Sequence, residues 1–456
     1  MERKQKIAGK KVTVFGAGKS GLAVASLLKK FGADVFVTEL KKDMEKELEF
    51  EELKRLKIDW ETGAHTQKAL EGKDFIVLSP GVPTDLPLLK GAQNQKIPIY
   101  SEIEVAYWLS QGRVVGITGS NGKTTTATLL GEILKEDGKK FKVCGNIGLP
   151  FSKVTEDLSQ KHIVVLELSS FQLEKIDEFH PEIAAVLNIT PDHLDRYPDL
   201  KSYKEAKLKI FENQTKDDFA ILNLDDTETR FLDSIVKAQK LFFSTQNRPE
   251  QGVFVKENEL VFRFFGKEEI VIDIDKIRIK GPHNLSNTAC ATCIAKVLGV
   301  KTEAIAKALE TFPGVEHRLE EVLTFSGVKF VNDSKATNVN SVWYALESFD
   351  CPIILLLGGR DKGGDFTKLK PLVQEKVKHL ILLGEAKDKI KFQLGDLVPS
   401  SFAQDIGEAV DIAYSKAKPK DCVLLSPGCS SFDMFENYEH RGKVFKSKVI
   451  EKKDEI

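Results

Sequence analysis

The sequence predicts an α/β protein with three domains. Short apolar runs that are typical of buried strands alternate with helix-length segments along most of the chain. Glycine-rich turns follow two of these runs, at residues 16–21 and 119–122. The chain has 456 residues, and a length of this order corresponds to about three domains.

The first domain is expected over residues 1–105. Lys11–Phe15 is a predicted strand, and Gly16-Ala17-Gly18-Lys19-Ser20-Gly21 follows it as a turn. A helix to Lys30 and a second strand, Asp34–Thr38, come next, with Glu39 directly after them. This pattern is typical of a dinucleotide-binding fold. From these residues alone, an NAD enzyme and a protein that binds a diphosphate-bearing substrate are both possible.

The second domain, expected over residues 106–313, begins with a phosphate-binding loop. The apolar run Val114–Ile117 leads into the loop Thr118–Thr124, and a helical pattern follows at once. Backbone amides of such a loop bind phosphate, while Lys123 would reach the β- and γ-phosphates and the Thr124 hydroxyl would bind Mg²⁺. Ile117 stands where the usual loop has a glycine, so this loop is a shortened form.

Further along this domain, polar groups follow buried strands. Ile163–Leu166 is followed by Glu167, and a carboxylate at a strand tip beside a phosphate loop is a typical Mg²⁺ ligand. The strand Ala184–Ile189 runs into a loop that contains His193, and a helix over Ser202–Phe211 contains Lys207. Residues 219–280 read as shorter strands that include a hairpin at 252–264.

Asn284 and Asn287 fall on one face of the helix that comes next. They either read the edge of a base or cap the helix.

The third domain is expected over residues 314–456, where the strand–helix alternation starts again. Its predicted strands are Val328–Val331, Pro352–Leu357, His379–Leu383 and Cys422–Leu425. Polar loops follow the first, second and last of them, and those after the second and last contain glycine. Open α/β sheets bind ligands at the carboxyl ends of their strands.

Composition excludes several classes of protein. With 41% hydrophobic and 30% charged residues and a net charge of −1, nothing favours binding to nucleic acid or to an anionic membrane. The first 18 residues lack the apolar segment of a signal peptide, and no apolar run is long enough to span a bilayer. Six cysteines form no disulfide framework, and Cys290 and Cys293 read as small buried residues of a helix. We expect a cytoplasmic protein that is not inserted in a membrane.

Seven segments, in their order along the chain, resemble the Mur ligases. They are GSNGKTT, ELSSFQLE, NITPDHLDRY, GPHNLSN, HRLE, NDSKATN and SPGCSSFDMF. The phosphate loop and the HNxxN helix are shared with folylpolyglutamate synthases, whereas DHLDRY, NDSKATN and SPGCSSFD resemble the branch that adds D-glutamate. The resemblance covers nearly the whole chain. It implies a Rossmann-like N-terminal domain for UDP, a central P-loop ATPase-type domain with a mostly parallel sheet, and a Rossmann-like C-terminal domain for the amino acid.

The activity that the resemblance implies is the ATP-dependent addition of D-glutamate to UDP-N-acetylmuramoyl-L-alanine, a step of peptidoglycan precursor synthesis. The substrate carboxylate takes the γ-phosphate of ATP, and the amine of D-glutamate attacks the acyl phosphate. The implied cofactors are two Mg²⁺ ions and a CO₂-derived carbamate on Lys207, and the implied state is a monomer. The alternatives are a sister Mur ligase or a folylpolyglutamate synthase-like ligase with another amino acid, and an ATP-binding module without ligase activity.

The resemblance also assigns residues. For catalysis they are Lys123, His193, Lys207 and Arg318. For ATP they are Gly119, Ser120, Asn121, Gly122, Lys123, Thr124, Thr125, Asn284, Asn287, Arg318, Asp333 and Lys335. For the metal ions they are Thr124, Glu167, His193 and the carbamate of Lys207. For the UDP substrate they are Gly18, Ser20, Glu39, Ser79, Gly81, Asn146 and Ser169, and for D-glutamate they are Thr337, Lys362, Ser431 and Tyr438.

Two positions depart from the family pattern. Glu39 stands where relatives often have Asp, and Tyr438 stands where they often have Phe.

Overall fold

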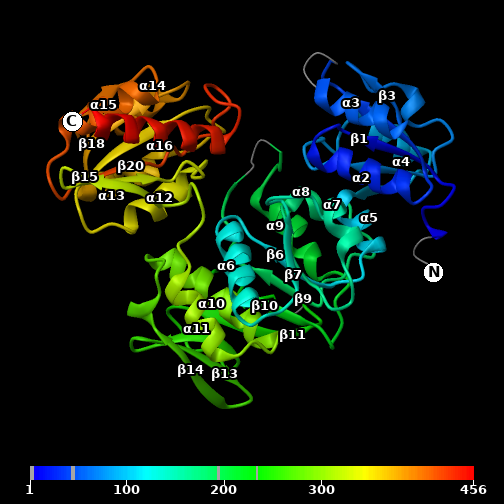
Figure 1. Ribbon diagram of the computed structural model, residues 1–456, viewed down its shortest axis with the longest axis horizontal. Helices are drawn as coiled ribbons and strands as arrows, with labels where there is room; N and C mark the ends of the chain where they lie inside the picture. The colour runs from blue at the N-terminus through cyan, green and yellow to red at the C-terminus, as the bar shows by residue number, and fades with distance from the viewer. Residues whose placement is uncertain (1–4, 43–46, 193–195, 233–234, 456) are drawn as a thin grey trace. The chain divides into compact units, whose positions relative to one another are not determined.

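A computed structural model describes residues 5–42, 47–192, 196–232 and 235–455 (Figure 1). The chain forms two compact units. The first comprises Met1–Thr190, Asp199–Ile274 and Asn287–Leu309 and contains two β-sheets, and the second comprises Pro191–Pro198, Asp275–Ser286 and Glu310–Ile456 and contains a third. Among the helices of the described residues, none is both long and apolar enough to cross a membrane.

The N-terminal sheet confirms the predicted Rossmann-like arrangement. Its elements are β1 (Lys11–Phe15), α2 (Lys19–Lys30), β2 (Asp34–Glu39), α3 (Glu47–Leu56), β3 (Asp59–Thr62), η2 (Gln67–Ala69), β4 (Phe75–Leu78), α4 (Pro87–Asn94), β5 (Ile99–Ser101) and α5 (Glu102–Leu109). The strands are parallel in the order β3-β2-β1-β4-β5. Alternate residues of β1 face opposite sides, so Val12 and Val14 pack with α2 and α3 while Phe15 packs with α4.

The central sheet has nine strands in the order β14-β13-β12-β11-β10-β9-β6-β8-β7. Its strands are β6 (Arg113–Thr118), β7 (Phe141–Gly145), β8 (Ile163–Glu167), β9 (Ile183–Val186), β10 (Phe219–Asn223), β11 (Gln239–Ser244), β12 (Gly252–Lys256), β13 (Glu259–Phe264) and β14 (Lys267–Asp273). Its helices are α6 (Lys123–Glu136), α7 (Phe151–Val154), η3 (Thr155–Asp157), α8 (Ser170–Leu173), α9 (Leu200–Leu208), η4 (Lys209–Phe211), η5 (Ile274–Lys276), α10 (Pro282–Val297) and α11 (Thr302–Thr311). The strands from β7 to β12 are parallel, and β12, β13 and β14 are antiparallel, which confirms the predicted hairpin.

Two predicted boundaries in this sheet differ from those observed. The strand expected to reach Ile189 ends at Val186, because the residues that follow bond to the phosphate loop: the Asn188 carbonyl accepts from Ser120 N–H (2.9 Å). The helix expected from Ser202 begins at Leu200, because the Asp199 carboxylate caps it by accepting from Ser202 N–H (2.7 Å).

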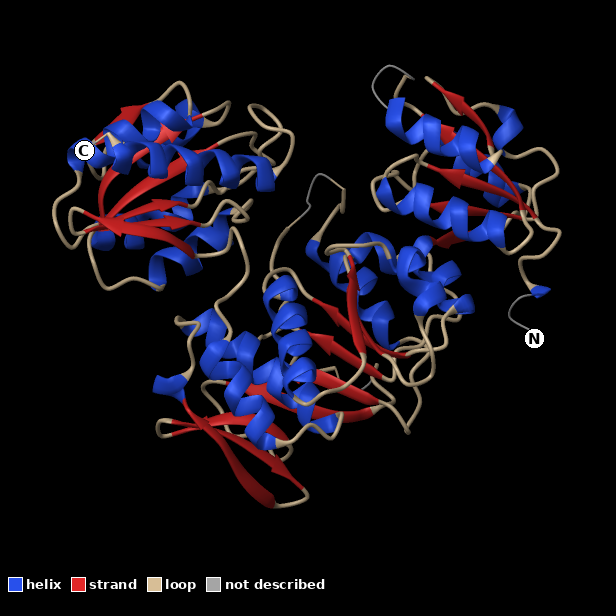
Figure 2. Ribbon diagram, viewed as in Figure 1, coloured by secondary structure: helices blue, strands red, loops and turns tan. Residues whose placement is uncertain are grey.

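The C-terminal sheet has six strands in the order β15-β16-β20-β17-β18-β19, with helices on both faces (Figure 2). Its elements are β15 (Glu320–Phe325), β16 (Val328–Asn332), α12 (Val339–Glu347), β17 (Ile353–Gly358), η6 (Phe366–Leu369), α13 (Lys370–Lys376), β18 (Val377–Leu383), α14 (Lys387–Leu394), β19 (Ser400–Phe402), α15 (Ile406–Lys416), β20 (Cys422–Leu425) and α16 (Tyr438–Asp454). The four predicted strands are β16, β17, β18 and β20, the parallel centre of the sheet. The antiparallel edge strand β15 and the short edge strand β19 were not predicted.

All six cysteines are free thiols. Cys290 and Cys293 lie fully buried within α10, as predicted, so their side chains belong to the packed interior.

Candidate active site

The phosphate loop lies between β6 and α6, at the centre of the nine-stranded sheet. Gly122 precedes the first residue of α6 with φ +85°, a left-handed conformation that favours glycine. A Cβ atom at this position would lie 2.2 Å from Oδ1 of Asn287 on α10. The turn therefore needs glycine for its backbone conformation and for its close contact with Asn287.

Replacing Gly122 by alanine is expected to reduce the affinity for adenine nucleotide and the ligase rate by about tenfold or more, since a left-handed L-residue costs about 1–2 kcal/mol and the added methyl group displaces Asn287. Nucleotide binding by calorimetry and the melting temperature would be measured together. Gly138→Ala is the matched control, because Gly138 has φ +68° but no atom within 4 Å of the added Cβ. Equal behaviour of the two variants would show that the contact with Asn287 has no role.

Asn188, two residues after the end of β9, holds the backbone of the phosphate loop through hydrogen bonds. Its side-chain carbonyl accepts from Asn121 N–H (2.8 Å), and its amide donates to the Asn121 carbonyl (3.2 Å). The Asn188 main-chain carbonyl accepts from Ser120 N–H (2.9 Å), and the Ser120 hydroxyl donates to the Thr190 carbonyl (3.0 Å). These four hydrogen bonds fix the backbone of the phosphate loop. No role was assigned to Asn188 from the sequence, although it is the first residue of the quoted segment NITPDHLDRY.

Two lysines meet on one carbonyl oxygen of this loop. Lys123 Nζ donates to the carbonyls of Gly119 (2.7 Å) and Ser120 (2.8 Å). Lys207 Nζ, from α9, donates to the same Gly119 carbonyl (2.9 Å) and lies 4.5 Å from the centre of the Tyr203 ring. The Lys207 side chain is only 1% exposed. The structure therefore brings together two residues that are far apart in sequence and that the resemblance assigned to catalysis.

Glu167 lies beside this loop, because it ends β8 and pairs with Ile117 of β6. It is 2% exposed, and its Oε1 accepts from the Asn146 amide (2.7 Å). Its Oε2 is buried, and no described residue donates a hydrogen bond to it. Buried carboxylate oxygens normally have a partner, so this atom suits a bound cation. Thr124, buried at the start of α6, is a second candidate ligand for the cation, through its hydroxyl group. His193 lies outside the described residues.

The glycine turn of the N-terminal sheet has the geometry of a diphosphate site. A Cβ atom on Gly21 would lie 1.8 Å from the Gly16 carbonyl oxygen, so only glycine lets α2 approach β1 this closely. The Glu39 carboxylate accepts from Ala17 N–H (2.7 Å) and Lys41 N–H (3.1 Å), and the Ser79 hydroxyl donates to the Gly16 carbonyl (3.1 Å). Glu39 and Ser79 thus brace the turn.

The remaining residues expected to bind the UDP substrate lie at loops and helix starts of the same unit. Gly18 and Ser20 lie at the start of α2, and Gly81 is exposed in the loop after β4. Ser169 caps α8 and shares hydrogen bonds with Gln172.

In the second unit, Arg318 and Asp333 lie close enough to interact. Burial raises the pKa of Asp333 to about 6, against the opposing charge of Arg318 and the hydrogen bond from the Ser426 hydroxyl (2.8 Å). Arg318 is flanked by His317 (φ 65°) and Leu319 (φ 44°), both in the left-handed region. Its Nε is buried, and no described group accepts its proton. Such local strain at a polar loop is typical of a binding site.

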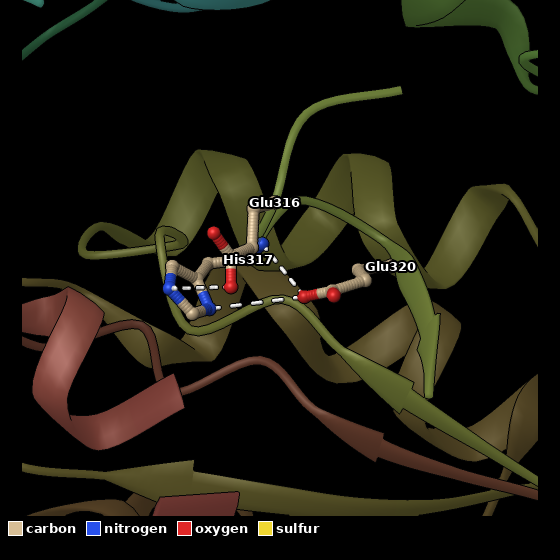
Figure 3. A group of neighbouring side chains, drawn as sticks. All are labelled: Glu316, His317 and Glu320. Carbon is tan, nitrogen blue, oxygen red and sulfur yellow. Dashed lines mark hydrogen bonds and ion pairs between the residues drawn. The ribbon is translucent and has the colours of Figure 1, made fainter. Parts of the chain in front are cut away.

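The group Glu316, His317 and Glu320 has metal-ligand side chains within reach of one another (Figure 3). However, Lys446 Nζ binds Glu316 (3.0 Å) and Glu320 (2.6 Å), so an ammonium already balances both carboxylates. The Asn332 amide donates to His317 Nδ1 (2.9 Å). We therefore assign this group to holding the backbone beside Arg318.

Three of the residues expected to bind D-glutamate lie on loops at the carboxyl edge of the third sheet, and the fourth, Tyr438, is the first residue of α16. Thr337 and Tyr438 are half-buried, Ser431 is buried and Lys362 is exposed. Lys335 Nζ lies 5.2 Å from the centre of the Tyr438 ring.

A residue that was not assigned from the sequence braces two of these loops. The buried Arg441 guanidinium donates to the carbonyls of Ser334 (2.8 Å) and Cys429 (3.2 Å).

On α10, Asn284 donates to the Lys280 carbonyl (2.9 Å), and its Oδ1 is buried without a donor among the described residues. The hydrogen bond to Lys280 is one that a residue in the first turn of a helix can make. Oδ1 of Asn284 stays available to a ligand.

Comparison with known proteins settles the family. Family models match the chain as the Mur ligase MurD-like N-terminal domain over residues 10–101, the Mur ligase middle domain over 117–295, and the Mur ligase glutamate ligase domain over 317–429. The UDP-N-acetylmuramoylalanine–D-glutamate ligase of Alkaliphilus metalliredigens is 43% identical, with 97% of this chain and 98% of the relative aligned. That of Koribacter versatilis is 45% identical, with 97% and 98% aligned.

The chain belongs to the Mur ligase family.

Solved Mur ligases share this fold at low sequence identity. MurC of Thermotoga maritima aligns with a TM-score of 0.59 at 18% identity, over 97% of this chain and 100% of that chain. MurF of Thermotoga maritima, solved in complex with ADP, aligns with a TM-score of 0.60 at 17% identity, over 98% and 97%. The expectation of three α/β domains of the Mur ligase type is therefore confirmed.

Proposed function

We propose that this Mur ligase joins D-glutamate to UDP-N-acetylmuramoyl-L-alanine with ATP, in cytoplasmic peptidoglycan precursor synthesis. The observation that carries the proposal is the convergence of Lys123 and Lys207 on the Gly119 carbonyl, beside Glu167. The names of the aligned relatives support the choice of D-glutamate. The alternative hypothesis of an NAD enzyme explains neither the position of these two lysines nor the presence of the phosphate loop.

The reaction has two steps. The carboxylate of the alanine residue attacks the γ-phosphorus of ATP, which gives an acyl phosphate and releases ADP. The amine of D-glutamate then attacks the carbonyl carbon, so that the amide bond forms and inorganic phosphate and a proton leave. Both steps build negative charge on oxygen atoms, and we assign its stabilisation to the ammonium of Lys123 and the guanidinium of Arg318.

Mg²⁺ is expected to bind Thr124, Glu167 and His193. Oε2 of Glu167, which accepts no hydrogen bond from the described residues, supports this assignment for one ligand. When bound, the ion supplies positive charge to the phosphate oxygens. The two-ion count stays a prediction.

We further propose that Lys207 reacts with CO₂. The neutral amine adds to the carbon of CO₂ and loses a proton, which converts a cation into a carbamate anion. The reaction needs the neutral amine form of the lysine. Lys207 is buried, and its Nζ lies on the same Gly119 carbonyl as Nζ of Lys123. The anion would attract Lys123 and a metal ion.

Substrate recognition is assigned by domain, with boundaries proposed near residues 105 and 313. The turn at Gly16–Gly21 and Glu39 support a UDP site in the first domain. Asn284, Asn287, Asp333 and Lys335 are assigned to ATP. Thr337, Lys362, Ser431 and Tyr438 are assigned to D-glutamate, because a lysine and hydroxyl groups suit a dicarboxylate. A monomer is the proposed state.

A substrate panel tests the proposal. ADP release is expected only when UDP-N-acetylmuramoyl-L-alanine and D-glutamate are both present, with L-glutamate, L-alanine and meso-diaminopimelate inactive. Faster turnover with one of those amino acids would assign the chain to a sister ligase. ATP hydrolysis that is unchanged when every acceptor is left out would instead favour an NTPase without ligase activity.

A further inference from the structure

His65 is a polar residue of the N-terminal sheet that no motif assigned. It follows β3, and its Nδ1 lies 2.7 Å from the Thr38 hydroxyl near the end of β2. Its ring centre lies 4.9 Å from that of Phe15, the last residue of β1. The imidazole is half-buried and therefore lies over the carboxyl ends of β1 and β2, with the edge strand β3 beside them.

The proton of the Thr38 hydroxyl decides which way this hydrogen bond runs. The hydroxyl lies 2.8 Å from Glu61 Oε1, and Glu61 also accepts from Thr66 N–H (2.9 Å). Although burial raises it, the hydrogen bonds from Thr66 and Thr38 lower the pKa of Glu61 overall, so the carboxylate is ionised and can only accept. Thr38 therefore donates to Glu61 and accepts from His65 Nδ1–H.

This chain of hydrogen bonds leaves Nε2 of the imidazole as an acceptor. Burial lowers the pKa of His65, and the opposing charges of Glu39 and Glu61 do not reverse the shift, so the ring is neutral at pH 7. A neutral ring with its proton on Nδ1 has a lone pair on Nε2. Within the described part of the chain, no group hydrogen-bonds to that nitrogen. It points to the side of the ring away from Thr38.

His65 lies where a base would be expected. In this type of sheet the diphosphate binds at the glycine turn after β1, and the acid after β2 contacts the ribose. Glu39 is that acid, and its carboxylate is bound to the turn through Ala17 N–H. The base then lies beyond the ribose, toward the ends of β2 and β3. The charge of Glu39 affects His65, which shows that the two side chains are close.

We propose that His65 Nε2 accepts the N3–H group of uracil and so selects the base of the UDP substrate. The inference rests on the proposed function, which places UDP in this domain. Uracil presents N3–H as a donor between two carbonyl oxygens, whereas cytosine presents an unprotonated N3 at the same position. A fixed acceptor therefore favours uracil over cytosine, because two lone pairs would otherwise face each other.

A cycle that changes protein and ligand together tests the proposal. The wild-type enzyme, His65→Ala and His65→Gln would be assayed with the natural substrate and with its N3-methyluridine analogue. His65→Ala is expected to raise KM for the natural substrate about tenfold, equal to about 1.4 kcal/mol, with kcat and the KM values for ATP and D-glutamate unchanged. For the wild type, the KM of the N3-methyluridine analogue is expected to be about tenfold higher than that of the natural substrate. For His65→Ala, the two KM values are expected to differ by less than about twofold. His65→Gln, whose amide oxygen can accept, should recover part of the affinity.

Additive effects of the two changes would overturn the proposal, as would an equal loss in His65→Ala and His65→Gln. A methyl effect that persists in His65→Ala but vanishes in Glu39→Gln would assign the N3–H contact to Glu39. A packing role alone would lower the melting temperature without changing the response to N3-methylation. Equilibrium binding of UDP and N3-methyl-UDP to the same variants separates this outcome from failure of the proposed function, because it requires no turnover.

Discussion

Lys207→Ala is expected to lower kcat by about 10²–10³-fold or more, the loss typical of removing one preorganised electrostatic group. The carbamate proposed on this lysine is an anion at the phosphate loop, and alanine cannot form it. Lys207 is buried against Tyr203 and the Gly119 carbonyl, so water cannot take its place at low cost. Steady-state ADP release with both substrates present would measure the loss.

Chemical rescue separates the carbamate from a structural role of the side chain. Formate or acetate at high concentration is expected to restore part of the activity of Lys207→Ala, because a small carboxylate can occupy the space of the missing group. Lys201→Ala is the control, since Lys201 lies on the same helix with 81% of its side chain exposed. A Lys207→Ala enzyme as active as the wild type, or an equal stimulation of the Lys201→Ala control by the same salts, would rule out the carbamate.

Lys123→Met is expected to lower kcat by about 10²–10³-fold while the enzyme still folds, because methionine keeps the length of the side chain and removes its charge. Lys123 Nζ donates to the carbonyls of Gly119 and Ser120. The negative charge of a phosphate bound at this loop would attract the ammonium group. Single-turnover measurement of acyl-phosphate formation would separate this loss from weaker ATP binding.

Lys135→Met provides the matched control for this variant. Lys135 lies at the other end of α6, with 64% of its side chain exposed and paired with Glu132. It should retain the wild-type rate. A Lys123→Met enzyme that loses only affinity, with kcat unchanged, would contradict a role in the chemical step.

The parts of the fold that the sequence predicted are those in which one physical signal dominates. Apolar runs such as Val114–Ile117 and Ile353–Leu357 are buried on both faces, so burial alone determines them. The edge strands β15 and β19 carry mixed, half-exposed residues, and their pairing depends on neighbours far away in sequence. The early end of β9 also depends on a segment far away in sequence, because the Asn188 carbonyl accepts from Ser120 N–H of the phosphate loop.

The candidate site residues were assigned from motifs and not from periodicity, and their roles stay predictions. Nothing in the spacing of Lys123 and Lys207 shows that both reach the Gly119 carbonyl, because α9 meets the loop only through tertiary packing. Asn188 and Arg441 support their loops through hydrogen bonds to backbone carbonyls and amides, and such contacts leave no local pattern. His65 likewise depends on the chain of hydrogen bonds through Thr38 to Glu61.

The transfer of one oxygen atom tests the central claim, that the phosphate loop delivers the γ-phosphate of ATP to a carboxylate. UDP-N-acetylmuramoyl-L-alanine labelled with ¹⁸O in its alanine carboxylate would be turned over with ATP and D-glutamate in unlabelled water. Formation and breakdown of an acyl phosphate predict that each released phosphate carries one oxygen from that carboxylate. Phosphate that carries no label, with its new oxygen drawn from water, would show hydrolysis of ATP and contradict the account.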